Sequence, residues 1–280
     1  MKAPARLVDL TRWCATSVDR MRTWLGLTWR GLCALAAGIV ALVAMVTVLG
    51  GVSEDVTQHN GLASSDAAHL RLFTDHRSDL LIQAARIVTS LGGVVVLALI
   101  AVAAGLLLWR RRVPLAAAAA PAFALGVAGT LADIGKQVVD RARPGVGLSV
   151  VAVGEPSFPS GHATDSAAVF LTLGLVVAVF VLRRPLARVA TVACSGLLVA
   201  AIGVTRLVLG VHWPTDVLAG WALGATAALV VTIGAVLLTR AMPPDSKSAD
   251  GRLRRFALGL GHLLTAERSP AHRPRKLHAA

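Results

Sequence analysis

The sequence predicts an all-α integral membrane protein: a bundle of six transmembrane helices with short helices on its outer surface. Hydrophobic residues make up 55% of the 280-residue chain and charged residues only 15%, whereas about 25% of the residues in a soluble domain are charged. The apolar residues gather in six charge-free runs, at 31–53, 87–109, 113–132, 166–182, 189–205 and 217–239. The buried core helices of a soluble protein would not produce six such runs in one chain.

The lengths of the runs fit membrane spans. A helix needs about 20 apolar residues to cross the hydrocarbon core of a bilayer, and four of the six runs reach that length. The runs 166–182 and 189–205 are shorter, and uncharged residues or a snorkelling arginine at their ends can extend them. The first run, 31–53, is too long for the apolar region of a cleaved signal peptide and follows an arm of 30 residues, so we expect it to be retained as the first span.

The charges predict the orientation of the spans. If residues 1–30 are cytoplasmic and the six runs alternate in direction, 21 of the 28 Lys and Arg residues fall on inner segments, and 10 of the 15 acidic residues fall on outer ones. This asymmetry is the positive-inside pattern, and it predicts a multi-pass protein of the cell (inner) membrane with both termini in the cytoplasm. The net charge of +13 then sets topology and attracts anionic membrane lipids. No folded basic module for nucleic acid is evident.

The chain is expected to divide into three parts: a basic cytoplasmic arm at 1–30, a six-span domain at 31–240, and a basic, disordered cytoplasmic tail at 241–280. In the last span, Gly220 and Gly224 have the GxxxG spacing that allows close helix contact. That spacing alone does not predict a dimer, and the oligomeric state stays open.

The first outer connection, residues 54–86, is expected to form one or two short helices on the membrane surface. Apolar residues recur at helical spacing through this segment and into the residue that follows it: Leu70, Phe73, Leu80, Leu81 and Ile87. The segment also holds three histidines whose spacing matches no zinc site, so we interpret them as surface residues and expect no metal: His59, His69 and His76.

The predicted topology brings three polar clusters to the outer end of the bundle. The first follows the third span and contains Lys136 and Arg143. Their separation of seven residues is about two helical turns, so we expect both on one helix face, with the helix stopped by Pro144. The second cluster opens the fourth span, and the third straddles the hairpin between the last two spans: Pro159, Ser160, Gly161 and His162, then Arg206, His212 and Asp216.

These residue types suit phosphate chemistry. Cations and free N–H groups at a helix N-terminus bind phosphate oxygens. One imidazole can attack phosphorus as a neutral nucleophile while a second protonates the leaving oxygen. Asp216, four residues after His212, is placed to orient the attacking ring, which favours His212 as nucleophile and His162 as acid. Singly, each residue has an ordinary explanation as a snorkelling anchor, a surface ring or a helix cap. The order and spacing of the whole set have no such ordinary explanation.

The three clusters resemble the tripartite pattern of the type 2 phosphatidic acid phosphatase superfamily, which is Lys-x6-Arg-Pro, Pro-Ser-Gly-His and Ser-Arg-x5-His-x3-Asp. Here the pattern runs from Lys136 to Pro144, from Pro159 to His162, and from Thr205 to Asp216. Thr205 stands in place of the serine that opens the family's third motif. Asp165, three residues after His162, could tune that histidine or face solvent, and we favour solvent.

The resemblance implies a six-helix membrane bundle and a metal-independent phosphohydrolase that forms a phosphohistidine. It implies that His212 is the nucleophile, His162 the acid and Asp216 the partner of His212. The phosphate-binding residues that it implies are Lys136, Arg143, Ser160, Gly161, His162 and Arg206.

We therefore expect a cofactor-free membrane phosphatase that hydrolyses a lipid phosphate or diphosphate, such as an isoprenoid diphosphate or a phosphatidate-like lipid, at the outer membrane face. One alternative is a phosphatase or phosphotransferase of the same fold acting on a soluble phosphoester. A less favoured one is a non-catalytic lipid-phosphate transporter or scaffold.

Overall fold

The computed structural model describes residues 16–17, 19, 28–145, 147–151 and 154–241. The predicted arm at 1–30 and the predicted tail at 241–280 lie almost wholly outside this range, so both stay predictions. Within the described residues the chain is helical and contains no strand. In order, the elements are α2 (Trp29–Gln58), the 3-10 helix η1 (Gly61–Ser65), α3 (Asp66–Thr74), α4 (Asp79–Ser90), α5 (Val94–Arg110), α6 (Leu115–Val139), α7 (Gly161–Phe180), α8 (Pro185–Val208) and α9 (Pro214–Ala241).

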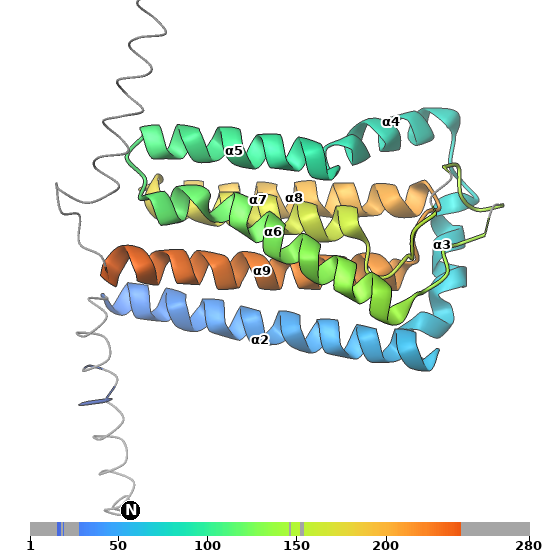
Figure 1. Cartoon of the computed structure of the whole chain (residues 1–280), viewed down its shortest axis with the longest axis horizontal. Helices are drawn as coiled ribbons and strands as arrows, with labels where there is room; N and C mark the ends of the chain where they lie inside the picture. Colours follow the sequence, from blue (N-terminus) through green and yellow to red (C-terminus); the bar gives the residue numbers. More distant parts are fainter. Residues whose placement is uncertain (1–15, 18, 20–27, 146, 152–153, 242–280) are drawn as a thin grey trace, which may run out of the picture. The chain divides into compact units, whose positions relative to one another are not determined.

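Five of these helices are long and apolar enough to cross a membrane, and the bent pair α4 and α5 makes a sixth span if it is counted as one. The predicted fold class, an all-α membrane bundle with short additional helices, is thus confirmed. The long helices lie side by side, and α3 runs across one end of them (Figure 1).

The second predicted run is not a single straight helix. It is split between α4 and α5, which meet at an angle of 49°, and α4 begins well inside the predicted outer connection. Gly92 and Gly93 fill the break, where a Cβ on Gly92 would come within 2.6 Å of the Ile202 side chain and 3.2 Å of His162. The close approach explains why glycine is required there, and it places the break beside the second polar cluster.

The helix α7 is the centre of the bundle and packs against α5, α6, α8 and α9. Its closest neighbour is α9, because Gly220 and Gly224 let the two backbones approach. A Cβ on Gly220 would lie 2.8 Å from the carbonyl oxygen of Ser160, and one on Gly224 would collide with the carbonyl of Thr164. The GxxxG spacing is therefore used for packing inside this chain.

Candidate active site

The structure brings the three predicted clusters together at the end of the bundle that α3 crosses. They come from the C-terminal end of α6 with its following loop, from the first turn of α7, and from the hairpin between α8 and α9. A Cβ on Gly161 would lie 3.8 Å from Nζ of Lys136, and the backbone N–H of Ser160 donates to the carbonyl of Asp216 at 3.0 Å. Pro214 is the first residue of α9, where its fixed φ and missing N–H are well tolerated.

The prediction that Lys136 and Arg143 share one helix face is wrong. The helix α6 ends at Val139, because Asp140 adopts the left-handed conformation with φ of 43° and its N–H donates to the carbonyl of Lys136. The helix thus ends five residues before Pro144, and Arg143 lies on the loop that follows.

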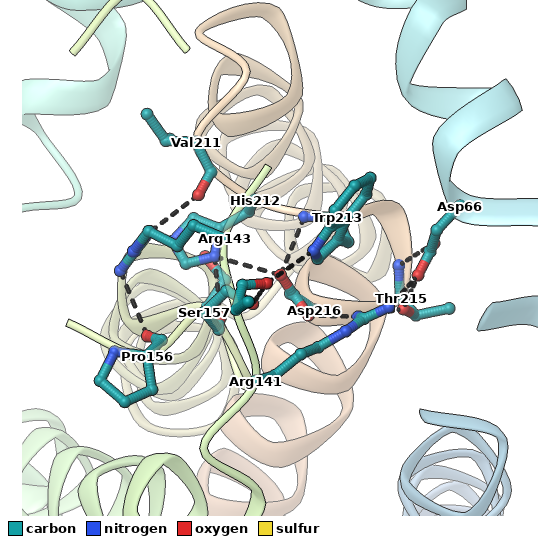
Figure 2. Close-up of polar contacts among 12 residues, drawn as sticks. Asp66, Arg141, Arg143, Pro156, Ser157, Val211, His212, Trp213, Thr215 and Asp216 are labelled. Atoms are coloured by element: carbon teal, nitrogen blue, oxygen red, sulfur yellow. Dashed lines mark hydrogen bonds and ion pairs between the residues drawn. The ribbon is translucent and has the colours of Figure 1, made fainter. Parts of the chain in front are cut away.

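The loop holds the guanidinium of Arg143 against backbone carbonyls. Nε donates to Glu155 O at 2.6 Å, and Nη2 donates to Pro156 O at 3.3 Å. Nη1 donates to Val211 O at 2.7 Å and lies 3.0 Å from Nε2 of His212. Figure 2 shows the guanidinium of Arg143 beside the carbonyls of Val211 and Pro156. Burial lowers the pKa of Arg143, and the nearby carboxylates of Asp216 and Glu155 oppose that shift.

These contacts define the tautomer of His212. A guanidinium can only donate hydrogen bonds, so Nε2, which faces Arg143, carries the lone pair. Nδ1 then carries the hydrogen and donates to the Ser157 carbonyl at 2.9 Å. The ring is buried, which lowers the pKa of His212 to about 4; Asp216 raises it, and Arg143 and Arg206 lower it further. At neutral pH the imidazole is therefore uncharged.

Asp216 has a more complex role than the sequence predicts. Its Oδ2 lies 3.5 Å from Nδ1 of His212, farther than the Ser157 carbonyl, and accepts a hydrogen bond from the backbone N–H of Trp213 at 2.8 Å. Its Oδ1 accepts from Nη1 of Arg141 at 2.6 Å. The carboxylate therefore caps the start of α9, pairs with a cation and faces the imidazole at the same time.

Two donors at the site have no protein partner within the described residues. The Ser160 hydroxyl and Nε of Arg206 are both buried without a hydrogen bond, while Nη1 of Arg206 donates to the Thr89 hydroxyl at 2.9 Å. Buried polar groups without partners are uncommon and costly. The oxygens of a bound anion are the kind of acceptor that would satisfy both donors.

Lys136 is paired with acids on the loop and on its own helix. Its Nζ lies 2.9 Å from Oε2 of Glu155 and 3.6 Å from Oδ1 of Asp133. The hydrogen bond and the charge of Lys136 lower the pKa of Glu155. Since the Glu155 side chain is 69% exposed, this carboxylate can leave the lysine at little cost.

The expectation that Asp165 faces solvent is wrong. The residue is half buried, and its Oδ1 is enclosed without a hydrogen-bond partner among the described residues. A Cβ on Gly129 of α6 would lie 3.6 Å from that oxygen. The carboxylate points toward α6 because the first turns of α7 pack against that helix.

The predicted surface histidines of the first outer connection are exposed, and no group of three or more His, Cys, Asp or Glu residues in the described part of the chain is arranged to hold a metal. Sequence reasoning missed five residues at the site. They are Asp66, Thr89, Arg141, Glu155 and Ser157. Glu155 and Ser157 lie on a loop and contribute backbone carbonyls, which carry no sequence signal. Arg141 could have been suggested by Arg143, two residues later.

Fold and site together define a polytopic membrane protein with cations and two imidazoles gathered at one end of the bundle. The family model of the PAP2 superfamily matches residues 117–239, which run from the start of α6 to the end of α9. This segment of the chain is similar to the PAP2 superfamily, the family that the three motifs resemble.

Several curated proteins are similar to this chain. The lipid A 1-phosphatase of Rhizobium johnstonii is 38% identical over 120 residues, which are 40% of this chain and 45% of that protein. The decaprenylphosphoryl-5-phosphoribose phosphatase of Mycobacterium tuberculosis is 37% identical over 125 residues, 44% of this chain and 62% of that protein. The chain thus spans about half the length of the curated relatives it matches.

A solved structure confirms the fold. The crystal structure of a transmembrane PAP2-type phosphatidylglycerolphosphate phosphatase from Bacillus subtilis matches with a TM-score of 0.58 and 22% sequence identity. The match covers 70% of this chain and 94% of the other, so the two proteins share most of the helical bundle.

Proposed function

We propose that this protein is a metal-independent membrane phosphatase that hydrolyses a phosphate or diphosphate monoester of a lipid through a phosphohistidine intermediate. One observation carries the proposal: the lone pair of Nε2 on buried, neutral His212 faces Arg143 at 3.0 Å. A nucleophile is thus held beside a cation that can bind the phosphate it would attack. An anion-binding scaffold would not require a buried imidazole in this tautomer.

In the proposed first step, Nε2 of His212 attacks phosphorus and forms the N–P bond as the bond from phosphorus to the lipid oxygen breaks. His162 gives its proton to that leaving oxygen. The imidazole becomes cationic as the N–P bond forms, and the Ser157 carbonyl and Asp216 stabilise the hydrogen and charge on its Nδ1 side. Water then attacks phosphorus as His162 takes its proton, the N–P bond breaks, and inorganic phosphate leaves with neutral His212 and protonated His162 regenerated.

The proposed phosphate site uses the first turn of α7 and the surrounding cations. The helix N-terminus and the Ser160 hydroxyl offer donors, and Gly161 leaves room for the anion to approach the backbone. Arg143 and Arg206 supply guanidinium groups, and Lys136 supplies a third charge once the exposed carboxylate of Glu155 leaves it.

A lipid substrate is supported by position and by the relatives. The site lies at one end of a bundle whose flanks are apolar, so a headgroup can enter while its tail stays in the bilayer. The curated relatives are phosphatases named for lipid A and for a decaprenylphosphoryl compound, and we infer an isoprenoid or phosphatidate-like lipid here. The distribution of basic residues supports cytoplasmic termini and an active site on the outer face. A soluble phosphoester substrate is the alternative, and a lipid-phosphate transporter or scaffold is less favoured.

A substrate panel on purified protein with chelator tests the proposal. Phosphate release from lipid phosphates and diphosphates, at rates well above those for p-nitrophenyl phosphate, is the expected result. His212→Ala should abolish release while the protein stays folded in detergent. Loss of activity on adding the chelator, or full activity of His212→Ala, would contradict the mechanism. Preference for the soluble ester would favour the alternative.

A further inference from the structure

Asp66 is a buried acid at the start of α3, the helix that crosses the end of the bundle. Only 2% of its surface is exposed. Its Oδ1 accepts a hydrogen bond from the backbone N–H of Thr215 at 3.0 Å, and its Oδ2 accepts from the Thr215 hydroxyl. The same Oδ2 accepts from Nη2 of Arg141 at 2.6 Å. Thus 149 residues of sequence separate the acid from the threonine that it holds.

Arg141 bridges two buried carboxylates. Nη2 binds Asp66, and Nη1 binds Oδ1 of Asp216 at 2.6 Å and the Thr215 hydroxyl at 2.8 Å. The guanidinium also lies over the ring of Trp213, 5.6 Å from its centroid. Figure 2 shows Arg141 reaching between Asp216 on one side and Asp66 with Thr215 on the other. One cation thus serves two carboxylates, and one of the two faces His212.

We propose that Asp66 and Arg141 are a positioning pair that fixes the orientation of Asp216 and partly offsets its negative charge. Through Asp216 the pair sets the reactivity of His212. The inference rests on the phosphatase function proposed above and adds to it the residues that tune its nucleophile. Neither residue contacts the imidazole. Arg141 fixes the Asp216 carboxylate by pairing with it, and Asp66 fixes Arg141 and the first turn of α9.

The pair has an electrostatic consequence with a defined sign. His212 faces the carboxylate of Asp216, the guanidinium groups of Arg143 and Arg206, and the imidazole of His162. Removing the charge of Arg141 leaves Asp216 less neutralised, so the carboxylate attracts a proton to His212 more strongly. Removing the charge of Asp66 leaves Arg141 to neutralise Asp216 alone, which acts in the opposite direction.

The test compares Arg141→Gln, Arg141→Lys and Asp66→Asn with wild-type protein in detergent, measuring kcat/KM for one lipid phosphate across acid pH. The profile of kcat/KM reports groups of the free enzyme, and the ionisation of the shared substrate is common to all variants. Arg141→Gln should lose activity about tenfold to hundredfold, the range typical when a group that orients a metal-ligating histidine is removed. Its acid limb should move to higher pH by about half a unit.

The other variants should separate charge from structure. Arg141→Lys keeps the charge, so its acid limb should stay at the wild-type position. Asp66→Asn should not move the limb upward, and combining it with Arg141→Gln should bring the limb back toward wild type. Arg77→Gln is the control, because Arg77 donates to the Leu148 and Val208 carbonyls at the same end. It should lower thermal stability without the upward shift.

The outcomes distinguish this inference from the function on which it rests. An active wild-type protein whose Arg141→Gln variant loses only thermal stability, with an unmoved acid limb, would overturn the positioning role and leave the phosphatase proposal intact. Upward shifts of equal size in Arg141→Gln and Asp66→Asn would overturn it as well. A wild-type protein without phosphatase activity would overturn both.

Discussion

Replacing Gly220 of α9 with alanine should displace the first turn of α7 and so damage the proposed phosphate site. The added Cβ would lie 2.8 Å from Ser160 O, 2.9 Å from the Ala163 Cβ and 3.1 Å from the Thr164 hydroxyl. Ordinary contacts with a Cβ begin at 3.4 Å, so α7 and α9 must separate by about half an ångström. Because protein interiors are close-packed, the neighbouring side chains cannot absorb that displacement without strain.

The expected magnitudes follow from that displacement. Overpacking costs about 1–3 kcal/mol, and the better helix propensity of alanine offsets up to about 1 kcal/mol of it. The net loss of stability is therefore modest. The displaced first turn of α7 carries Ser160, Gly161 and His162, and misplacing reactive groups by about 1 Å can cost a hundredfold in rate. We expect kcat/KM for a lipid phosphate to fall about tenfold.

The matched control is Gly234→Ala in the same helix, where no described atom beyond the adjacent helix backbone lies within 4 Å of the added Cβ. It should keep wild-type activity and stability. Phosphate release and the temperature at which each variant loses its monodisperse elution peak in detergent give the two readouts. Wild-type activity in Gly220→Ala, or equal damage in Gly234→Ala, would refute the reasoning.

Three further results are expected. Thr89→Val removes the hydroxyl that accepts from Arg206 at 2.9 Å. KM should rise roughly tenfold with a smaller change in kcat, since a hydrogen bond to a charged group is worth about 1.5–3 kcal/mol. An unchanged KM would contradict the proposed role of Arg206 in phosphate binding. Glu155→Gln removes the carboxylate that pairs with Lys136, so KM should fall about twofold to fivefold, because an exposed pair is worth up to about 1 kcal/mol. A rise in KM would instead assign the carboxylate a role in binding. Thermal stability should fall as the pH drops from about 6.5 to about 4, because in this window the unfolded chain binds a proton that the folded His212 ring does not. The upper limit is the ordinary histidine pKa, and the lower limit is the pKa of His212 in the folded protein, about 4. His212→Gln should show a shallower decline, and an equal slope would contradict the assignment.

The sequence predicted the spans well because membrane crossing is a local requirement. A run of about 20 apolar residues is visible without knowledge of its neighbours, and the order of runs then determines which connections meet at each end. The motifs around Lys136, His162 and His212 could be placed at one end for that reason. Pro214 could be recognised as a helix start because its geometry is fixed by its own ring.

What the sequence did not predict depends on contacts between distant segments or on backbone geometry. Nothing near Asp66 indicates that it binds Thr215 and Arg141, since those partners come from other helices and loops. The acceptor of the His212 ring is a main-chain carbonyl, that of Ser157, and any residue has one. The end of α6 depends on the left-handed conformation of Asp140, which a non-glycine residue adopts only where its surroundings favour it.

A rapid-quench experiment with a substrate labelled on its terminal phosphate tests the central claim most directly. Wild-type protein mixed with labelled lipid phosphate and quenched within the first turnover should carry the label on the peptide that contains His212. His212→Ala should carry none and release none. Turnover with the label on another residue, or phosphate release by His212→Ala at the wild-type rate, would contradict the phosphohistidine mechanism proposed for this site.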